Sequence, residues 1–426
     1  MFFHAIYNMQ SQIKDPALAG QGKLNLELAE RNMGALMKIR ERFLRERPLE
    51  GVRIGMALHV TKETGILVRT LRDGGATVAI TGCNPLSTQD DVAAALAEEE
   101  GVFVYGYKGE TNEDYYKYMN AVIDFAPQIT IDDGCDLVTE LVTKRQDKLE
   151  GVIGGCEETT TGVIRLKAME KEGVLKFPMV AVNDNKTKHL MDNYYGTGQS
   201  TLDGIIRASN VLFAGKTVVV AGYGSCGKGV ALRAKGMGAN VIVTEVDPFP
   251  ALQARMDGFR VMKMEDALPE GDIYITVTGN KHVIRVEHME KMKNGAILAN
   301  SGHFDVEIDV VGLGNAASKR RVRPYFDEYL FPDGHSVFLA GEGRLVNLAA
   351  AEGHPSEVMS LSFCGQALAC EWIYKNRSEL GPKVYVLPDE IDTQISWLQL
   401  KVMGISIDEL TDEQKRYLAS WNEGTA

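Results

Sequence analysis

The sequence predicts an α/β protein with two open parallel-sheet lobes and a small helical C-terminal segment. Short apolar runs alternate with helix-like stretches from residue 51 onward, which is typical of parallel strands joined by crossover helices. The alternation falls into two blocks, and a length of 426 residues favours more than one domain. The second block is joined to the first at both of its ends, so we expect it to be inserted into a larger lobe.

The first block begins with a helical pattern and continues with four strand patterns. Apolar side chains at helical spacing over residues 24–47 predict one long amphipathic helix. Turn residues and a helix-like stretch follow each of the runs VRIGMAL, ATVAITG, VFVYGY and PQITIDD. These runs predict the sheet of the larger lobe, at residues 1–191 and 353–386.

The second block, at residues 192–352, contains the strand patterns AGKTVVVAGYG, ANVIVTEVD, DIYITVTG and AILANSG. It joins the larger lobe near residues 192–204 and 341–360, and two such crossings predict a hinge. Residues 387–426 show two helical patterns that have no core of their own. We therefore expect them to form an oligomerisation segment that packs on another subunit.

Composition limits the partners of this chain. The net charge of −12 disfavours nucleic acid, and no apolar run is long enough to predict a membrane span. The first fifteen residues contain neither a basic leader nor a small-residue cleavage site, and the six cysteines form no CxxC pair. We expect a cytoplasmic protein with reduced thiols, no metal site and a small-molecule partner.

A glycine motif in the second block predicts a dinucleotide cofactor. Gly222, Gly224 and Gly227 follow an apolar strand and begin a helix, where they permit a tight turn, close approach of a pyrophosphate and close helix packing. Glu245, at the end of the next strand, is positioned to accept hydrogen bonds from ribose hydroxyls and to repel a 2′-phosphate. The inserted lobe is thus predicted to be a Rossmann domain that binds NAD.

Polar strings at the predicted strand ends identify the chemistry more closely. HVTKETGILVRTL, GCNPLSTQDDVAAAL, IDDGCDLV, GGCEETTTGV, VNDNKTKHLMDNYYG, SGHFDVEID and EGRLVNLAAAEGHPSEVMS closely resemble the S-adenosylhomocysteine hydrolase family, over about residues 14–420. The resemblance implies reversible hydrolysis of S-adenosylhomocysteine to adenosine and homocysteine. It also implies NAD that is reduced and reoxidised in each turnover, and a homotetramer or dimer.

The resemblance assigns roles to individual residues. It implies that Lys188 and Asp192 take the 3′-hydroxyl proton during hydride transfer, which a buried lysine can do if burial lowers its pKa. Asp133 is implied in C4′ proton chemistry, whereas Asp132 is expected to be structural. The six residues implied in catalysis are His59, Asp133, Glu158, Lys188, Asp192 and His303.

Further residues match binding positions of the family. The nucleobase pocket is expected to contain Thr61, Glu63, His354, Met359 and Phe363, with Glu63 accepting a hydrogen bond from an exocyclic amine. Plain core packing is an equal interpretation for Met359 and Phe363. The residues expected at the cofactor are Thr159, Thr160, Thr161, Asn193, Gly222, Gly224, Gly227, Glu245, Thr278, Asn300 and Asn347.

The sequence also departs from the family pattern. It stops at SWNEGTA where long-tailed members continue with a Lys- and Tyr-containing tail, and Pro250 stands where an Asn is common. Thr197 and Gly198 replace a frequent Cys-Arg pair. S-inosylhomocysteine therefore stays open as an alternative substrate, although Glu63 favours adenine. A non-catalytic NAD-binding regulator and an ordinary dehydrogenase are further alternatives.

Overall fold

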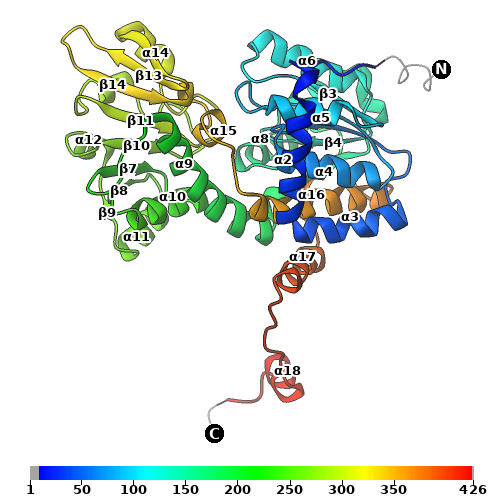
Figure 1. Cartoon of the computed structure of the whole chain (residues 1–426). Coiled ribbons are helices and arrows are strands. Elements are labelled where there is room, and N and C mark those ends of the chain that lie inside the picture. Colours follow the sequence, from blue (N-terminus) through cyan, green and yellow to red (C-terminus); the bar gives the residue numbers. More distant parts are fainter. Residues whose placement is uncertain (1–8, 425–426) are drawn as a thin grey trace.

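The computed structural model describes residues 9–424, which form two lobes side by side and a helical arm that projects from one of them (Figure 1). The expectation about a leader at the N-terminus rests partly on residues 1–8, which lie outside this range. Each lobe has one sheet with helices on both faces, so the chain has the predicted α/β fold.

The sheet of the larger lobe has seven strands, all parallel. In spatial order they are β15 (Val384–Tyr385), β6 (Met179–Ala181), β5 (Gly154–Glu157), β4 (Ile129–Asp132), β1 (Arg53–Ala57), β2 (Thr77–Thr81) and β3 (Val102–Tyr105). Most residues of the central strands are buried, because helices cover both faces of the sheet. Four of these strands were predicted, and the short strands β5, β6 and β15 extend the sheet at one edge.

Crossover helices and one returning helix enclose this sheet. They are α4 (Lys62–Asp73), α5 (Asp90–Ala97), α6 (Asn112–Asp124), α7 (Asp136–Thr143), α8 (Thr160–Glu172) and α16 (Ser356–Asn376). The hydroxyl of Thr61 accepts a hydrogen bond from the Thr64 amide and so caps α4. Helix α16 enters from the inserted lobe and packs on α4 and β5, which brings its first turns to the strand ends.

The N-terminal helical region differs from the prediction. Two helices, α2 (Ala19–Asn32) and α3 (Gly34–Glu46), replace the single long helix expected over residues 24–47. The backbone leaves helical geometry at Met33, with φ −112° and ψ 47°, and the Met33 side chain is fully buried. The break lets α2 pack on α5 while α3 packs on α16, so both apolar faces reach the core.

The inserted lobe has a sheet of eight strands. Their order is β12 (Ser318–Arg323), β13 (Phe326–Leu330), β14 (Ser336–Ala340), β11 (Ala296–Asn300), β10 (Ile273–Thr276), β7 (Thr217–Ala221), β8 (Asn240–Thr244) and β9 (Arg260–Val261). The sheet is parallel from β14 to β9, whereas β13 pairs antiparallel with both β12 and β14. The lobe is therefore a parallel sheet with an antiparallel edge that the sequence patterns did not reveal.

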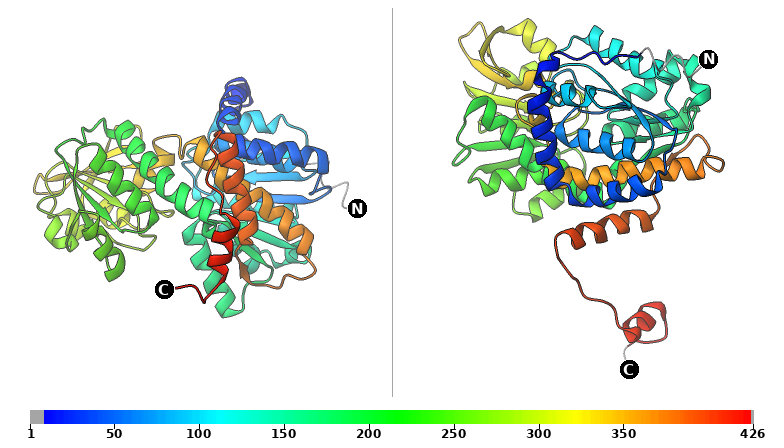
Figure 2. Two further views of the ribbon diagram at one scale, coloured as in Figure 1. Left: turned by 90° about the horizontal axis from the view of Figure 1, so that it is seen from below. Right: turned by 45° about the vertical axis from the view of Figure 1, so that its right-hand side comes forward.

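Helices flank this second sheet on both sides (Figure 2). They are α9 (Thr197–Ser209), α10 (Ser225–Gly236), α11 (Pro248–Met256), α12 (Met264–Ala267), α13 (Val286–Met289), α14 (Val310–Ala316) and α15 (Val346–Ala349). Helix α10 begins directly after the turn that follows β7 and packs against α9. The start of α10 therefore lies at the carboxyl edge of the sheet.

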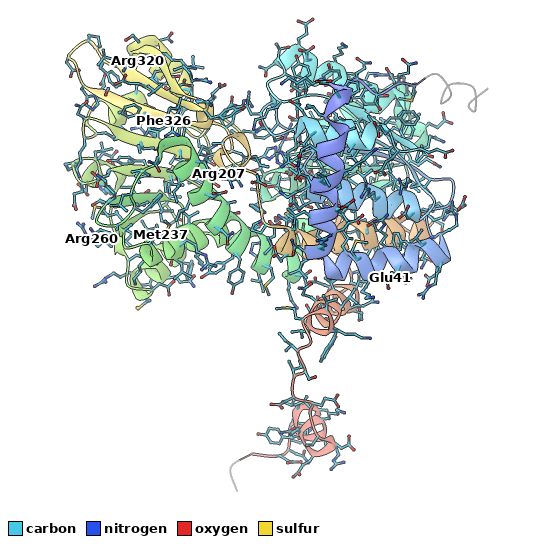
Figure 3. All side chains as sticks on the ribbon, viewed as in Figure 1. Glu41, Arg207, Met237, Arg260, Arg320 and Phe326 are labelled. Atoms are coloured by element: carbon cyan, nitrogen blue, oxygen red, sulfur yellow. The ribbon has the colours of Figure 1, made fainter. Side chains whose placement is uncertain are left out.

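Two chain segments connect the lobes. The first is the π-helix η4 (Lys188–Gly196), which continues directly into α9, and the second leads from α15 into α16. Glu352 on the second segment forms ion pairs with Lys62 (2.9 Å) of the larger lobe and with Arg207 (3.2 Å) of α9. Arg207 lies on the side of α9 that faces the larger lobe (Figure 3). Ion pairs thus join both lobes to the second connection.

The C-terminal segment contains the two predicted helices, α17 (Asp389–Val402) and α18 (Asp412–Ala419). Helix α17 packs on α16 and α3, and Asp392 accepts hydrogen bonds from the backbone amides of Lys186 and Thr187. Helix α18 has no buried residue. Among residues 9–424, no helix combines the length and apolar composition that a membrane crossing requires.

Candidate active site

One cavity of about 760 Å³ lies between the lobes. Many of its polar side chains come from the loops that follow parallel strands of both sheets, where α/β proteins place their ligands, and others come from η4 and α4. In the larger lobe His59, Asp133 and Glu158 follow β1, β4 and β5. All of the predicted site residues line this cavity except Gly227 and Asn300.

Asp133 lies between two histidines that come from different lobes. His59 Nε2 is 3.4 Å from Asp133 Oδ2, and His303 Nδ1 is 3.4 Å from Asp133 Oδ1. His59 Nδ1 lies 2.8 Å from the Ser87 hydroxyl, which fixes the ring from behind. Below, His59, Asp133 and His303 are called the histidine–aspartate group.

Burial controls the charge of this group. Burial lowers the pKa of His59 to about 4, although Asp133 acts in the opposite direction. Burial also lowers the pKa of His303, again against the effect of Asp133. Both imidazoles are therefore neutral near pH 7 and can accept or donate a proton.

A second polar group forms where η4 meets the larger lobe. Lys188 Nζ lies 2.7 Å from Asn193 Oδ1, 3.0 Å from Asp192 Oδ1 and 3.8 Å from Glu158 Oε1. The π-helical register places side chains four and five residues apart on the same side as Lys188, and single π turns are frequent at functional sites. Below, Lys188, Asp192 and Glu158 are called the lysine–carboxylate group.

Neighbouring carboxylates, more than burial, set the charge of Lys188. Burial alone lowers the pKa of its ammonium, but Asp192 and Glu158 together raise that pKa above its ordinary value. Burial likewise raises the pKa of Asp192, yet Lys188 and His354 reverse this and hold it below the usual range. The condition under which Lys188 itself would take a proton, a lowered pKa, is therefore not met, because two carboxylates lie within 4 Å of the ammonium.

Glu158 is the member of this group that titrates near neutral pH. Burial raises its pKa to about 7, against the attraction of Lys188. Its carboxylate also accepts hydrogen bonds from the Ser362 hydroxyl and the Gln366 amide of α16. Glu157, and not Glu158, holds the adjoining loops, because it accepts from the Gly134 amide (2.8 Å) and the Thr159 amide (3.1 Å).

The five predicted nucleobase residues all line the cavity. Glu63 is almost fully buried, and its Oε1 accepts a hydrogen bond of 2.6 Å from the Ser356 hydroxyl. Lys62 Nζ lies 3.4 Å from the same oxygen. Thr61, Met359 and Phe363 are other members of this set. The second oxygen of Glu63 is thus left to accept a hydrogen bond from a ligand.

His354, which was predicted for the nucleobase pocket, also contacts the lysine–carboxylate group. Its Nδ1 lies 3.3 Å from Asp192 Oδ2, and its Nε2 lies 3.3 Å from the Thr197 hydroxyl. The ring still lines the cavity. It therefore connects the start of α9 to the charged pair on η4.

The glycine turn has the geometry that the sequence predicted. Gly222 has φ +107°, a conformation in which a side chain is strained, and no atom lies within 4 Å of the place that a Cβ on Gly224 would occupy. A Cβ on Gly227 would lie 2.1 Å from the Gly222 carbonyl oxygen, so Gly227 serves helix packing and does not line the cavity. Glu245 accepts hydrogen bonds from the amides of Tyr223 (2.8 Å) and Val246 (2.7 Å) at the cavity wall.

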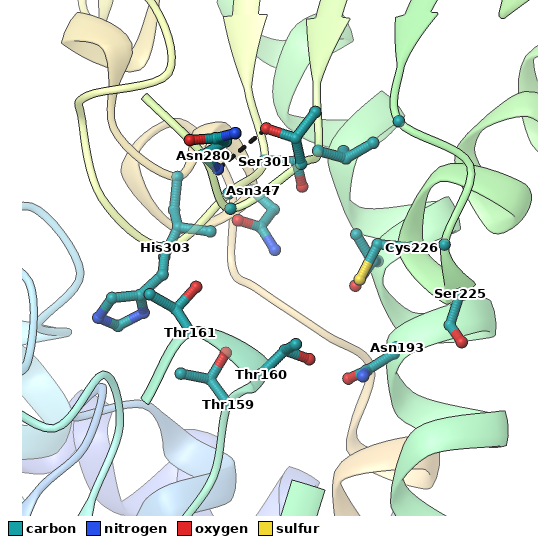
Figure 4. A pocket seen from close by; sticks show the side chains of 18 of the residues that line it. Thr159, Thr160, Thr161, Asn193, Ser225, Cys226, Asn280, Ser301, His303 and Asn347 are labelled. Atoms are coloured by element: carbon teal, nitrogen blue, oxygen red, sulfur yellow. Dashed lines mark hydrogen bonds between the residues drawn. The ribbon is translucent and has the colours of Figure 1, made fainter. Parts of the chain in front are cut away.

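Polar side chains from both lobes face each other across the rest of the cavity. Figure 4 shows Thr159, Thr160 and Thr161 on the side of the larger lobe, with Asn347 opposite them. Asn347 Nδ2 donates to the Ser200 hydroxyl at 3.1 Å, while its buried Oδ1 has no partner among the described residues. That oxygen is available to accept a hydrogen bond from a ligand amide.

Asn300 departs from its predicted role. Its side chain is fully buried, donates to the Gly302 and Gly343 carbonyls, and accepts from Thr276 Oγ1 at 3.0 Å. Asn300 does not line the cavity. Its hydrogen bond to the Gly302 carbonyl holds the loop that contains His303. The periodicity of β11 alone does not distinguish such an interior amide from one that faces a ligand.

Sequence reasoning missed one buried acid beside the cofactor turn. Glu307 accepts hydrogen bonds from the amide and hydroxyl of Thr278 (2.9 and 2.7 Å) and from the Gly279 amide (2.7 Å). It therefore holds the loop after β10 in place. Glu307 lies in the motif SGHFDVEID, in which the histidine was the residue predicted to be functional. Nothing in the spacing of this motif indicates that the Glu307 side chain contacts residues 278 and 279.

Two groups of the described side chains come close enough to serve as metal ligands: His59, Cys83 and Asp133, and Asp132, Cys135 and Glu157. In the second group both Asp132 oxygens already accept backbone amides, those of Asp133 and Val138, each at 2.9 Å. Asp132 thus has the structural role expected of it.

Comparisons with known proteins agree with this geometry. Residues 10–150 match the family described as S-adenosyl-L-homocysteine hydrolase, and residues 193–353 match its NAD-binding domain. An S-inosyl-L-homocysteine hydrolase of Methanocaldococcus jannaschii is 60% identical over 97% of this chain and 100% of its own length. Adenosylhomocysteinases of Saccharolobus solfataricus and Aquifex aeolicus are 59% and 58% identical, each over 98% of this chain and 100% of their own length. The chain belongs to the S-adenosyl-L-homocysteine hydrolase family.

Proposed function

We propose that the protein catalyses the reversible, NAD-dependent hydrolysis of S-adenosyl-L-homocysteine to adenosine and L-homocysteine. The observation that carries this proposal is the convergence of the histidine–aspartate group, the lysine–carboxylate group and the glycine turn on one cavity. The thioether carbon of this substrate has no acidic neighbour until C3′ is oxidised. A site for the whole reaction must therefore combine a redox cofactor with proton-transfer groups.

The residues of the inserted lobe fit NAD. Gly222 and Gly224 leave room for a pyrophosphate at the start of α10, where backbone amides and the helix dipole favour an anion. The unpartnered Oδ1 of Asn347 suits a carboxamide N–H. NAD, when bound, supplies hydride transfer from C3′ and its reversal. Thr159, Thr160, Thr161, Asn193 and Thr278 are proposed to hold its nicotinamide half.

The lysine–carboxylate group is assigned to the 3′-hydroxyl, which loses its proton as C3′ is oxidised. Lys188 is charged, so its ammonium stabilises negative charge that develops on O3′. Glu158, with its pKa near 7, accepts the proton at neutral pH. Asp192 holds Lys188 from the other side at 3.0 Å.

The histidine–aspartate group is assigned to the later steps. Oxidation of C3′ makes the C4′ proton acidic. The carboxylate of Asp133, between the two histidines, is the group proposed to accept this proton. Neutral His59, oriented by Ser87, then exchanges protons with the leaving thiol and with the water that adds at C5′. His303, from the inserted lobe, lies beside the same Asp133 carboxylate.

The nucleobase pocket favours adenine. The Ser356 hydroxyl donates a hydrogen bond to Oε1 of Glu63. The other carboxylate oxygen is therefore proposed to accept a hydrogen bond from an exocyclic amine. Hypoxanthine carries a carbonyl at that position, and a carboxylate repels it. Adenine is therefore the proposed base.

S-inosyl-L-homocysteine is the second candidate substrate, and one observation favours it. Lys62 Nζ lies 3.4 Å from Glu63 Oε1, so a cationic donor stands beside the carboxylate. Such a donor can neutralise the repulsion of a carbonyl oxygen. Because one relative of this chain is an S-inosyl-L-homocysteine hydrolase, an assay must compare the adenosyl and inosyl substrates.

The experiment is a thiol-release assay with NAD-loaded protein and each nucleosyl-homocysteine. Release from the adenosyl substrate, with NAD still oxidised at the end, is expected. Thiol release from the inosyl substrate and not from the adenosyl substrate would show that the base is hypoxanthine and not adenine. A non-catalytic regulator predicts no thiol from either, and an ordinary dehydrogenase predicts stoichiometric NADH without thiol.

The assembly and location are also proposed. Trp397, Leu418 and Trp421 of the C-terminal segment are between half and almost fully exposed, which supports packing on another subunit of a homodimer or homotetramer. All six cysteines are free thiols, which fits the cytoplasm. Sedimentation velocity of the whole protein tests the assembly.

A further inference from the structure

His189 reaches from the lobe connection to the phosphate-binding turn. It is the second residue of η4, and its Nε2 lies 3.0 Å from the hydroxyl of Ser225, the first residue of α10. On the other side of the ring, Nδ1 lies 3.5 Å from the Asn193 amide nitrogen. Both His189 and Ser225 line the cavity. The imidazole thus stands at the rim of the turn that is shaped for a pyrophosphate.

Figure 4 shows Asn193 and Ser225, the two side chains that the ring contacts, on the same side of the cavity. Gly224, directly before Ser225, has open space where a side chain would stand. A pyrophosphate held by the amides at the start of α10 would have the Ser225 hydroxyl and its imidazole partner as neighbouring donors.

The charges that act on the ring come from three elements. They are Asp184 of η3 (Val182–Asp184), Lys188 of η4 and Lys228 of α10. Helices α9 and α16, which also pack on η4, contribute none. Asp184 is itself 3.3 Å from Lys167 of α8. Lys188 is in turn paired with Asp192 at 3.0 Å, so Lys228 is the cation near the ring that a bound anion can reach together with the imidazole.

We propose that His189 is a cofactor-binding residue that donates from Nε2 to the pyrophosphate of NAD and takes up a proton as NAD binds. This inference rests on NAD binding by the inserted lobe, and not on the hydrolysis reaction. The pyrophosphate brings negative charge next to the Ser225 contact of the ring, and an imidazolium is a stronger hydrogen-bond donor to it than a neutral imidazole.

The direction of the pH effect follows from linkage. In the free protein burial lowers the pKa of His189, with Lys188 and Lys228 acting in the same direction and Asp184 against them. A bound pyrophosphate raises that pKa, so the complex binds more protons than the free protein between the two values. NAD affinity is therefore highest at low pH and falls as pH rises.

The test is equilibrium dialysis of NAD-loaded protein against graded NAD at several pH values, with no nucleosyl-homocysteine present. We expect the wild-type Kd to rise about tenfold from about pH 5.5 to about pH 8.5, as the titration of a single imidazole between these values can produce. His189→Gln keeps a neutral donor but cannot titrate, so its Kd should be weaker at low pH and nearly independent of pH. His335→Gln is the matched control, because His335 bonds the Met292 carbonyl far from the turn.

A purely structural role for His189 predicts a different result. If the ring only steadies Ser225, His189→Gln shifts Kd by the same factor at every pH, and that parallel shift would overturn the proposal. Equal Kd values for wild type and His189→Gln would overturn it as well. Calorimetry in two buffers of different ionisation enthalpy gives an independent reading, since only wild type and His335→Gln should take up the extra proton on binding NAD. A failure here leaves the hydrolase assignment intact, because no substrate is used.

Discussion

His303 Nδ1, on the inserted lobe, lies 3.4 Å from Asp133 Oδ1 on the larger lobe. The other oxygen of the same carboxylate lies 3.4 Å from His59 Nε2. One carboxylate therefore joins two neutral histidines that come from separate domains. The proton-transfer centre is complete only when the lobes pack as they do in this structure.

Asp133→Asn should separate oxidation from elimination. The amide preserves the shape of the site but cannot accept the C4′ proton, so thiol release should fall by about 10²–10⁴-fold. Oxidation at C3′ uses the other group and should continue, and NADH absorbance should therefore accumulate in stopped-flow traces. Wild-type thiol release by this variant would contradict the role of Asp133.

Lys188→Gln should block the earlier step. Loss of the ammonium leaves Asp192 and Glu158 facing the reacting hydroxyl without a counter-charge. Both NADH formation and thiol release should fall, by about 10²–10³-fold, as expected for a lost electrostatic contact to developing charge. Circular dichroism and NAD content verify that the variant is folded and loaded. NADH accumulation like that of Asp133→Asn would show that the two groups have been assigned in the wrong order.

Ser356→Ala should weaken recognition of the base. Ser356 fixes Oε1 of Glu63 through a buried hydrogen bond of 2.6 Å. Loss of a bond of this kind costs about 1 kcal/mol, so KM for the adenosyl substrate should rise roughly fivefold with little change in kcat. Discrimination against the inosyl substrate should narrow at the same time. An unchanged KM ratio between the two substrates would mean that Ser356 does not orient Glu63.

Glu110 should make stability depend on pH. Burial raises its pKa to about 8 from 4.5, and its Oε1 and the nearby hydroxyls of Thr81 and Thr88 have no partner among residues 9–424. The folded protein keeps a proton on Glu110 that the unfolded chain releases above about pH 4.5. The free energy of unfolding therefore falls as the pH rises from about 4.5 to about 8.

Glu110→Gln should therefore be more stable than wild type at about pH 9, by on the order of a few kcal/mol, and differ little at about pH 5. Denaturant unfolding at the two pH values measures the difference. Glu113→Gln, on the exposed face of α6, is the matched control and should show no such dependence. A constant difference between wild type and Glu110→Gln across this range would contradict the buried, protonated carboxyl.

The features that sequence predicted well are those whose physics is local. The turn at Gly222 and the acid at Glu245 are set by a strand, a tight turn and a helix that follow one another in the chain. The order of strands and crossovers likewise predicted two sheets. The break at Met33 was missed, because the periodicity continues through it and only packing on two different partners separates α2 from α3.

The features that sequence missed depend on contacts between distant segments. Ser356 bonds Glu63, and Glu307 bonds Thr278, across separations that spacing does not reveal. The direction of the Lys188 pKa stayed open for the same reason. Motif spacing placed Asp192 near Lys188, but Glu158, which follows β5, also raises that pKa. Charge states at this site are properties of the folded cavity.

The central claim is that hydrolysis proceeds through oxidation at C3′ followed by proton loss at C4′. The most direct measurement is incubation of NAD-loaded protein with adenosine in deuterated water, followed by proton NMR of the nucleoside. We predict that deuterium appears at C4′ and at no other carbon-bound position of the ribose, and that Asp133→Asn slows this exchange. Thiol release from S-adenosyl-L-homocysteine without any C4′ exchange would contradict the account, because direct hydrolysis at C5′ leaves the C4′ proton in place.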